Sequence, residues 1–399
     1  MHRLTPAVQH YAWGSRTAIP ELLGIPATDG PVAEAWFGTH ASAPSRCVAP
    51  DGAPVPLSAL VARDARAALG ADVVARFGPR LPYLLKVIAA ERPLSLQVHP
   101  HLERARTGYD EEDAAGIPVD APHRNYRDRN HKPELVYALT QFEALSGFRA
   151  PRRAAELFAG LDTPLAERLH AMLVEHPSSE AIRAVFTRLL EPSTRPSSSE
   201  VAELAAAVAR READSSPSPR ADATVALLQE AYPGDPGVVT SLLLNPVTLQ
   251  PGEAMFVPAG CVHAYLHGVA VEIMASSDNV LRAGLTPKHV DIAELLRNVD
   301  DIAAPPIRVA PETFHGATRV FYAPVDDFEL SVTDIADHDL HPLPGRGPRI
   351  LLCLDGQVEV VAPAADALTL VRGQAAFVPA SDGRLTVRGA GRLVQADVP

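Results

Sequence analysis

The stretch from Gly252 to Lys288 constrains the fold most, because it joins a tight turn to a long strand that begins with a histidine. Its opening has the spacing G-x5-P-x-G-x2-H and ends on His263. Pro258 and Gly260 predict the turn of a β-hairpin, since glycine accepts backbone angles that other residues avoid. A metal ligand at the start of this strand is one interpretation. An ordinary hairpin whose histidine caps a loop is the other.

Strand alternation predicts which side chains accompany this histidine. Residues two apart in a strand point to the same side of the sheet. We therefore expect His263, Tyr265 and His267 to share one face.

Two earlier stretches supply further polar groups in alternating positions. In RPLSLQVHPH (92–101), Ser95, Gln97 and His99 alternate with apolar residues, which predicts a strand with one polar face. In NHKPEL (130–135), the proline favours an extended backbone for the residue before it, so Lys132 and Glu134 share a face.

Together these segments offer one amide oxygen, two imidazoles and one carboxylate, from Gln97, His99, Glu134 and His263. Zinc accepts nitrogen and oxygen ligands of this kind, and a catalytic zinc keeps one position open. The same donors also suit iron, manganese or nickel. The residue types alone therefore predict a metal site without naming the metal.

Four segments together resemble a known family. They are LPYLLKV (81–87), RPLSLQVHP (92–100), NHKPELVYALTQFEALSGFR (130–149) and the stretch 252–288. In this order they look like type I mannose-6-phosphate isomerases. The turn that leads to the histidine also resembles the second motif of cupin β-barrels, although His267 stands where that motif usually has asparagine.

The resemblance implies a fold, a reaction and a ligand set. It implies a cupin-type zinc enzyme with one Zn²⁺ per chain that interconverts mannose 6-phosphate and fructose 6-phosphate. It also implies that Gln97, His99, Glu134 and His263 bind the metal.

The distribution of lysine supports a site for an anionic substrate. The chain has 36 lysines and arginines, but only Lys86, Lys132 and Lys288 are lysine, and all three lie in the segments above. A compact ammonium differs from a planar guanidinium in the contacts it can make. With only three residues, chance is the alternative explanation.

Isomerisation also requires a group that moves a proton between carbons. Glu272 interrupts the apolar run GVAVEIM, and burial would raise the pKa of its carboxyl. We predict that Glu272 is the base; a structural partner of Arg282 is the alternative role. Lys132, or water on the metal, is the alternative base.

The remaining polar residues of these segments are predicted to contact the substrate. Arg282 would lie over the enediolate or share the phosphate with Lys288. Ser95, Lys86 and Tyr265 complete the predicted substrate-binding set.

Composition limits the remaining possibilities. A chain of 399 residues predicts two or three domains. A net charge of −12 without a basic stripe argues against nucleic acid as a partner. The N-terminal residues lack the apolar core of a signal peptide, no apolar run predicts a membrane span, and three cysteines are too few for a disulfide framework. We expect a cytoplasmic monomer.

The chain is predicted to be mainly β with an α-helical insertion. A catalytic cupin barrel is expected from residues 1–150 and 236–310, with a helical domain at 151–235 between them. Two Ser/Pro-rich stretches, 191–200 and 213–222, are predicted to be exposed linkers within the helical domain. A second, metal-free cupin-like barrel is expected at 311–399.

An internal repeat supports the second barrel. GEAMFVPA (252–259) is echoed by GQAAFVPA (373–380), but no histidine follows the second copy. A duplicated barrel that lost its ligands explains this pattern.

Two other functions fit parts of this pattern. Two histidines and one carboxylate also bind iron in non-haem oxygenases. A cupin that binds sugar without catalysis, as a sensor or storage protein, is the non-enzymatic possibility. The oxygenase leaves Gln97 and the three lysines unexplained. The sugar-binding cupin does not account for Glu272, Arg282 and Lys288 together.

Overall fold

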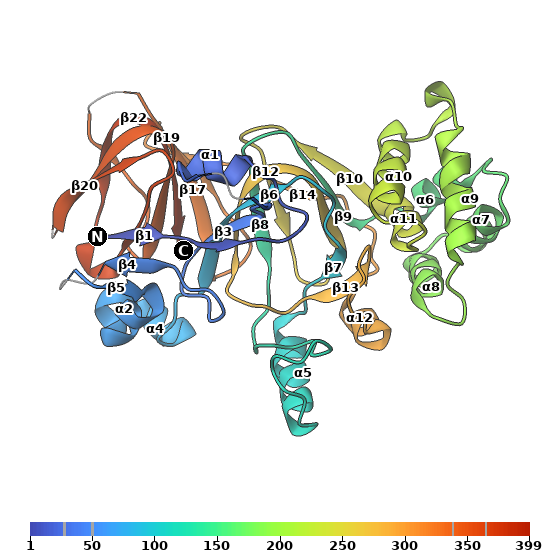
Figure 1. The fold of residues 1–399 in the computed structure, drawn as a ribbon, viewed down its shortest axis with the longest axis horizontal. Helices are drawn as coiled ribbons and strands as arrows, with labels where there is room; N and C mark the ends of the chain where they lie inside the picture. The colour runs from blue at the N-terminus through green and yellow to red at the C-terminus, as the bar shows by residue number, and fades with distance from the viewer. Residues whose placement is uncertain (27–28, 49–51, 337–338, 364) are drawn as a thin grey trace.

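The structure, a computed structural model, describes residues 1–26, 29–48, 52–336, 339–363 and 365–399. Among these residues strands predominate, in two separate antiparallel sheets of 11 strands each. Figure 1 shows the two sheets side by side along the long axis and a group of helices beyond the central sheet. The expectation of a mainly β protein with helices is confirmed.

The central sheet is built around one long strand, β12 (His263–Ala275). Its second half pairs with β6 on one side and β8 on the other, while its first half pairs with β7 and β9. The sheet comprises β2 (Ala7–Gln9), β3 (Glu34–Phe37), β6 (Tyr83–Ala90), β7 (Leu96–Val98), β8 (Glu134–Ala138), β9 (Phe142–Phe148), β10 (Leu244–Leu249), β11 (Ala254–Val257), β12, β13 (Leu281–Gly284) and β14 (Ile307–Val309).

The other sheet is formed mostly by the C-terminal part of the chain. It comprises β1 (His2–Thr5), β4 (Arg46–Val48), β5 (Pro54–Pro56), β15 (Glu312–Phe314), β16 (Thr318–Phe321), β17 (Glu329–Ile335), β18 (His341–Pro342), β19 (Arg349–Ala362), β20 (Ala365–Val371), β21 (Ala375–Val378) and β22 (Thr386–Asp397). Three N-terminal strands thus belong here, since β1 pairs with β21 and β4 lies between β1 and β5. The predicted domain boundary places all of residues 1–150 in the first barrel. It therefore does not match the division of the strands into two sheets.

The repeat has the same local structure in both copies. Gly252 and Gly373 have φ angles of 92° and 82°, a region that favours glycine. Each glycine is followed by a strand of four buried residues, β11 or β21. The first copy leads into β12 with His263 at its start, whereas a short 3₁₀ helix (Ala380–Asp382) follows the second.

Neither sheet closes into a complete barrel among the residues that the structure describes, since both strand orders are open paths. The apolar core nevertheless spans the two sheets. One cluster contains Phe37, Tyr83 and Ile273 from the central sheet together with Phe328 and Phe377 from the C-terminal part.

Helices flank the sheets. They are α1 (Ala18–Leu23), α2 (Leu57–Arg63), α3 (Ala65–Leu69), α4 (Ala71–Phe77), α5 (Leu102–Ala114), α6 (Pro151–Phe158), α7 (Pro164–Glu175), α8 (Ser179–Leu190), α9 (Ser198–Ala209), α10 (Pro219–Ala231), α11 (Gly237–Thr240) and α12 (Ile292–Asn298). In the described parts of the chain no helix is both long and apolar enough to cross a membrane.

The two predicted linkers are partly wrong, because each one contains the start of a helix. Ser197 and Glu200 form a reciprocal capping box at α9. Ser218 accepts a hydrogen bond from the backbone N–H of Ala221 at the start of α10, with Pro219 in the first turn. The serines and prolines of these stretches therefore begin helices as well as separating them.

Candidate metal centre

Three predicted ligands meet at one point inside the central sheet. His99 follows β7, Glu134 begins β8 and His263 begins β12, and all three side chains are buried. His99 Nε2 lies 3.0 Å from Glu134 Oε1, and His263 Nε2 lies 3.5 Å from Glu134 Oε2. Their ligand atoms all lie within 4.8 Å of one another, a spacing that could hold one metal ion.

Backbone carbonyls orient both imidazoles. His99 Nδ1 lies 2.8 Å from the carbonyl oxygen of Asn279, and His263 Nδ1 lies 3.0 Å from that of Cys261. An Nδ1–H that donates to a carbonyl leaves the Nε2 lone pair free for an ion. Burial first, and then the charge of Lys132, lowers the pKa of His99 to about 4, so its ring is neutral as a ligand must be.

Gln97 lies beside this group. It pairs with His263 across β7 and β12, and its Nε2 is 3.1 Å from His263 Nε2. Rotating the terminal amide by half a turn exchanges its nitrogen and oxygen. The amide oxygen would then face the same point as the three other ligands.

Glu134 is held in its ionised form by its neighbours. Lys132 Nζ donates to Oε1 at 2.8 Å and the Tyr265 hydroxyl donates to Oε2 at 2.6 Å. Burial alone would raise the pKa of this carboxyl, but Lys132 and His99 hold it well below its usual range. Two imidazoles, a carboxylate and an amide oxygen fit zinc.

Glu272 lies on the adjoining part of β12, beside Lys86. Its Oε2 is 3.1 Å from Lys86 Nζ, which also lies 3.9 Å from Glu34 Oε1 and over the Trp36 ring. Burial, and then the charge of Glu134, raises the pKa of Glu272 to about 6. Burial favours the neutral amine of Lys86, but Glu272 and Glu34 together raise its pKa. Among the described residues no ion pair joins Glu272 to Arg282, so the structural alternative for Glu272 has a different partner.

One cavity of about 680 Å³ connects these groups. The predicted residues that line it are Lys86, Ser95, Gln97, Lys132, Glu134, Tyr265, Glu272, Arg282 and Lys288. Segments that are far apart in the sequence thus contribute to a single site. His99 and His263 are buried beside the cavity and do not line it.

Arg127 and Asp278 belong to this site although no sequence pattern predicted them. Arg127 lines the cavity. Burial is the largest cause that lowers the pKa of Arg282 and of Lys288, and the charge of Arg127 lowers both further. Asp278 also lines the cavity and contacts the buried His40, whose Nε2 is 3.2 Å from Asp278 Oδ1. Arg127, Asp278 and His40 all lie in loops outside the strands, where alternation gives no signal.

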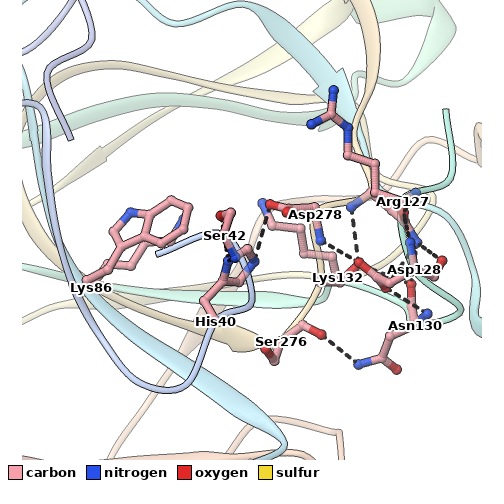
Figure 2. A network of polar contacts seen from close by, with 12 residues as sticks. His40, Ser42, Lys86, Arg127, Asp128, Asn130, Lys132, Ser276 and Asp278 are labelled. Atoms are coloured by element: carbon pink, nitrogen blue, oxygen red, sulfur yellow. Dashed lines mark hydrogen bonds and ion pairs between the residues drawn. The ribbon is translucent and has the colours of Figure 1, made fainter. Parts of the chain in front are cut away.

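A polar network holds the loops that carry these residues (Figure 2). The Asp128 carboxylate accepts hydrogen bonds from the backbone N–H of Asn130 and Asp278 and from the Ser277 hydroxyl. The buried Asn279 donates to the carbonyl oxygens of Asp128 and Asn130. The carbonyl that orients His99 therefore belongs to a residue fixed by hydrogen bonds on several sides.

The prediction for His267 is wrong. A register shift between Tyr265 and His267 interrupts the pairing of β12 with β9, and His267 is exposed. A β-bulge of this kind turns the following side chain to the other side. Of the three side chains His263, Tyr265 and His267, the first two reach the buried site.

Comparisons with known proteins agree with this geometry. The family model for the catalytic domain of phosphomannose isomerase type I matches residues 1–151. The mannose-6-phosphate isomerase of Escherichia coli K12 is 41% identical over 99% of this chain and 99% of its own length. The human mannose-6-phosphate isomerase is 31% identical, over 95% of this chain and 93% of its own length.

Solved structures give the same result. A phosphomannose isomerase mutant from Salmonella typhimurium superposes with a TM-score of 0.91 at 39% identity, covering 99% of this chain and 98% of that one. A zinc-bound mannose 6-phosphate isomerase superposes with a TM-score of 0.89 at 40% identity, with the same coverage. Because relatives of this identity extend over nearly the whole chain, the protein belongs to the type I phosphomannose isomerase family.

Proposed function

We propose that this protein is a mannose-6-phosphate isomerase that binds one Zn²⁺ per chain and interconverts mannose 6-phosphate and fructose 6-phosphate. The observation that carries the proposal is the buried group of His99, Glu134 and His263 beside a cavity lined by cationic side chains. We assign Gln97 as the fourth ligand. Zinc at this point would supply a Lewis acid for the sugar's carbonyl and hydroxyl oxygens.

The reaction moves a proton between neighbouring carbons of the sugar through an enediol. Glu272 is the base in this proposal, because it lines the cavity and burial brings its pKa close to neutrality. Lys86 holds the ionised carboxylate from 3.1 Å away. Lys132 and Tyr265 both donate to Glu134, so they position that ligand and can also contact a substrate oxygen at the cavity wall.

The phosphate is proposed to bind where Arg127, Arg282 and Lys288 line the cavity. No ion pair with a carboxylate is found for these three side chains in the described structure. After burial, the charge of Arg127 lowers the pKa of Arg282, and the charges of Arg282 and Arg127 lower the pKa of Lys288. A phosphate dianion would compensate this concentration of positive charge. Ser95, which lines the same cavity, is assigned to the substrate's hydroxyl groups.

Replacing Lys288 by alanine should mainly weaken substrate binding. Losing one charge-assisted hydrogen bond of about 1.5–3 kcal/mol corresponds to roughly a 10- to 150-fold rise in KM, with little change in kcat. Steady-state kinetics with mannose 6-phosphate measure this. Arg152→Ala, an exposed cation on α6, is the matched control. An unchanged KM for Lys288→Ala would move the phosphate elsewhere.

Metal removal tests the proposed function itself. Dialysis against a chelator should abolish isomerisation in a coupled assay, and about one equivalent of zinc should restore it, because the sugar's oxygens lose their Lewis acid. Metal analysis of the purified protein gives the stoichiometry. Full activity of the metal-free protein would contradict the mechanism.

Neither alternative function gains support from a specific observation. A non-haem iron oxygenase would contain iron and consume oxygen, and a non-catalytic sugar-binding cupin would bind the sugar without turning it over. The relatives matched over the full chain are named isomerases. The assay and the metal analysis above distinguish all three functions.

We also propose the domain layout expected from the sequence, with one adjustment. Residues 151–235 form a helical insertion between the parts of a cupin-type catalytic unit, and a metal-free cupin-like unit follows residue 310. The adjustment adds β1, β4 and β5 to the second unit, because they pair within its sheet. The monomeric state, the cytoplasmic location and the lack of a nucleic-acid partner stay predictions from the sequence.

A further inference from the structure

A second cavity, of about 450 Å³, lies where the helical region meets the central sheet. It is lined by the end of β9 and by α6, by one residue of β10, by the residues before α10, and by the segment between α12 and β14. These residues are Phe148, Arg149, Ala150, Arg153, Glu156, Leu157, Pro217, Ser218, Asn245, Ala303, Ala304 and Pro305. None of them lines the catalytic cavity, so the two cavities are separate.

Arg149 is the unusual residue of this cavity. Its Nε donates to the carbonyl oxygen of Leu244 at 2.6 Å, while its Nη2 is buried and has no partner in the described structure. Burial, and then the nearby charge of Arg220, lowers the pKa of Arg149 to about 10. A guanidinium that is partly buried, lacks hydrogen-bond partners and lies near another cation lowers the stability of the fold, unless an anion compensates its charge.

The surrounding carboxylates are engaged with other arginines. Glu156 pairs with Arg153 at 2.9 Å, and Asp222 pairs with Arg211 at 3.1 Å. No carboxylate in the described part of the chain forms an ion pair with Arg149. The cavity therefore keeps excess positive charge, and Ser218 at the N-terminus of α10 adds the positive end of a helix dipole to it.

Part of the remaining wall is apolar. Phe148, Leu157, Pro217 and Pro305 contribute carbon surface, which a bare inorganic ion would leave unused. We propose that this cavity is a second ligand site, which binds a small organic oxyanion, a phosphate monoester or a carboxylate, with its charged end against Arg149. A guanidinium suits both head groups, because its planar N–H groups match two oxygens at once.

Calorimetric titration of the full-length zinc-loaded protein tests the proposal. Phenyl phosphate and benzoate represent the two head groups, and benzyl alcohol is the neutral control. Arg149→Met should weaken binding at this site by at least about tenfold, the cost of one charge-assisted contact. Arg152→Met removes the same charge from the exposed surface nearby and should bind as the wild type does.

A second variant keeps the test decisive if Arg149→Met folds poorly. Arg153 is exposed and also lines the cavity, so Arg153→Gln should weaken the same binding while leaving the fold intact. Both variants should retain wild-type isomerase activity, since neither residue lines the catalytic cavity. Loss for phenyl phosphate alone, or for benzoate alone, identifies the head group. Titrations of both probes that are unchanged in both variants would overturn the proposal.

Discussion

Replacing Glu134 by glutamine is expected to lower zinc content to near zero and turnover by at least about 10³-fold. The carboxylate is the only anionic member of the ligand group, and both imidazoles are grouped around its two oxygens. Glutamine keeps the shape but removes the negative charge that attracts the cation. Losing a Lewis acid costs several kcal/mol of transition-state stabilisation, and each 1.36 kcal/mol is tenfold in rate.

Metal analysis and coupled-assay kinetics measure the two effects separately. Glu203→Gln, an exposed carboxylate on α9, makes the same chemical change away from the site and should retain both zinc and activity. A Glu134→Gln protein that still contains a full equivalent of zinc would show that the ion binds elsewhere.

Replacing Glu272 by glutamine should lower kcat by about 10²–10⁴-fold, the usual contribution of a general base, with zinc content unchanged. The amide cannot accept the carbon-bound proton, although it fills the same space beside Lys86. The kcat/KM of the wild-type protein should also fall in acid. Glu272, with its pKa raised to about 6, is a base only above that pH, so kcat/KM should fall as pH drops below it.

The sign and position of this acid limb can be checked. A zinc cation nearby favours the carboxylate and moves the limb to lower pH, never to higher pH. The residual activity of Glu272→Gln should lack the limb. Near-normal turnover in the variant, or the same acid limb, would assign the proton transfer to another group.

Strand alternation is a local property, so it predicted which polar side chains point together, and the family resemblance joined them into one proposed ligand set. Gln97, His99 and Glu134 lie in short extended segments, where the period of two fixes which side chains point together. The same rule failed at His267, where a bulge shifts the register of β12. A bulge depends on how two strands meet, which neither strand's sequence reveals alone.

Strand alternation could not predict the loop residues of the site. Arg127 and Asp278 enter the cavity because Asp128 and Asn279 tie two distant loops together. Contacts between loops follow no period, so no pattern in the sequence marks them.

The set of strands that forms the C-terminal sheet could not be predicted from the sequence for a similar reason. β1 is short, and its first residue is only half-buried, so its own residues do not indicate a partner. Pairing with β21 depends on where the rest of the fold leaves an open edge.

This pairing has a consequence for how the protein is made. His2 lies opposite Phe377, so during synthesis the pairing of β1 with β21 must wait until about 375 further residues have been made. At about 5–20 residues per second, the delay is roughly 20–75 s. During that time β4 can already pair with one edge of β1, while the edge that later meets β21 stays open. The C-terminal sheet therefore gains this strand pair only after β21 has left the ribosome.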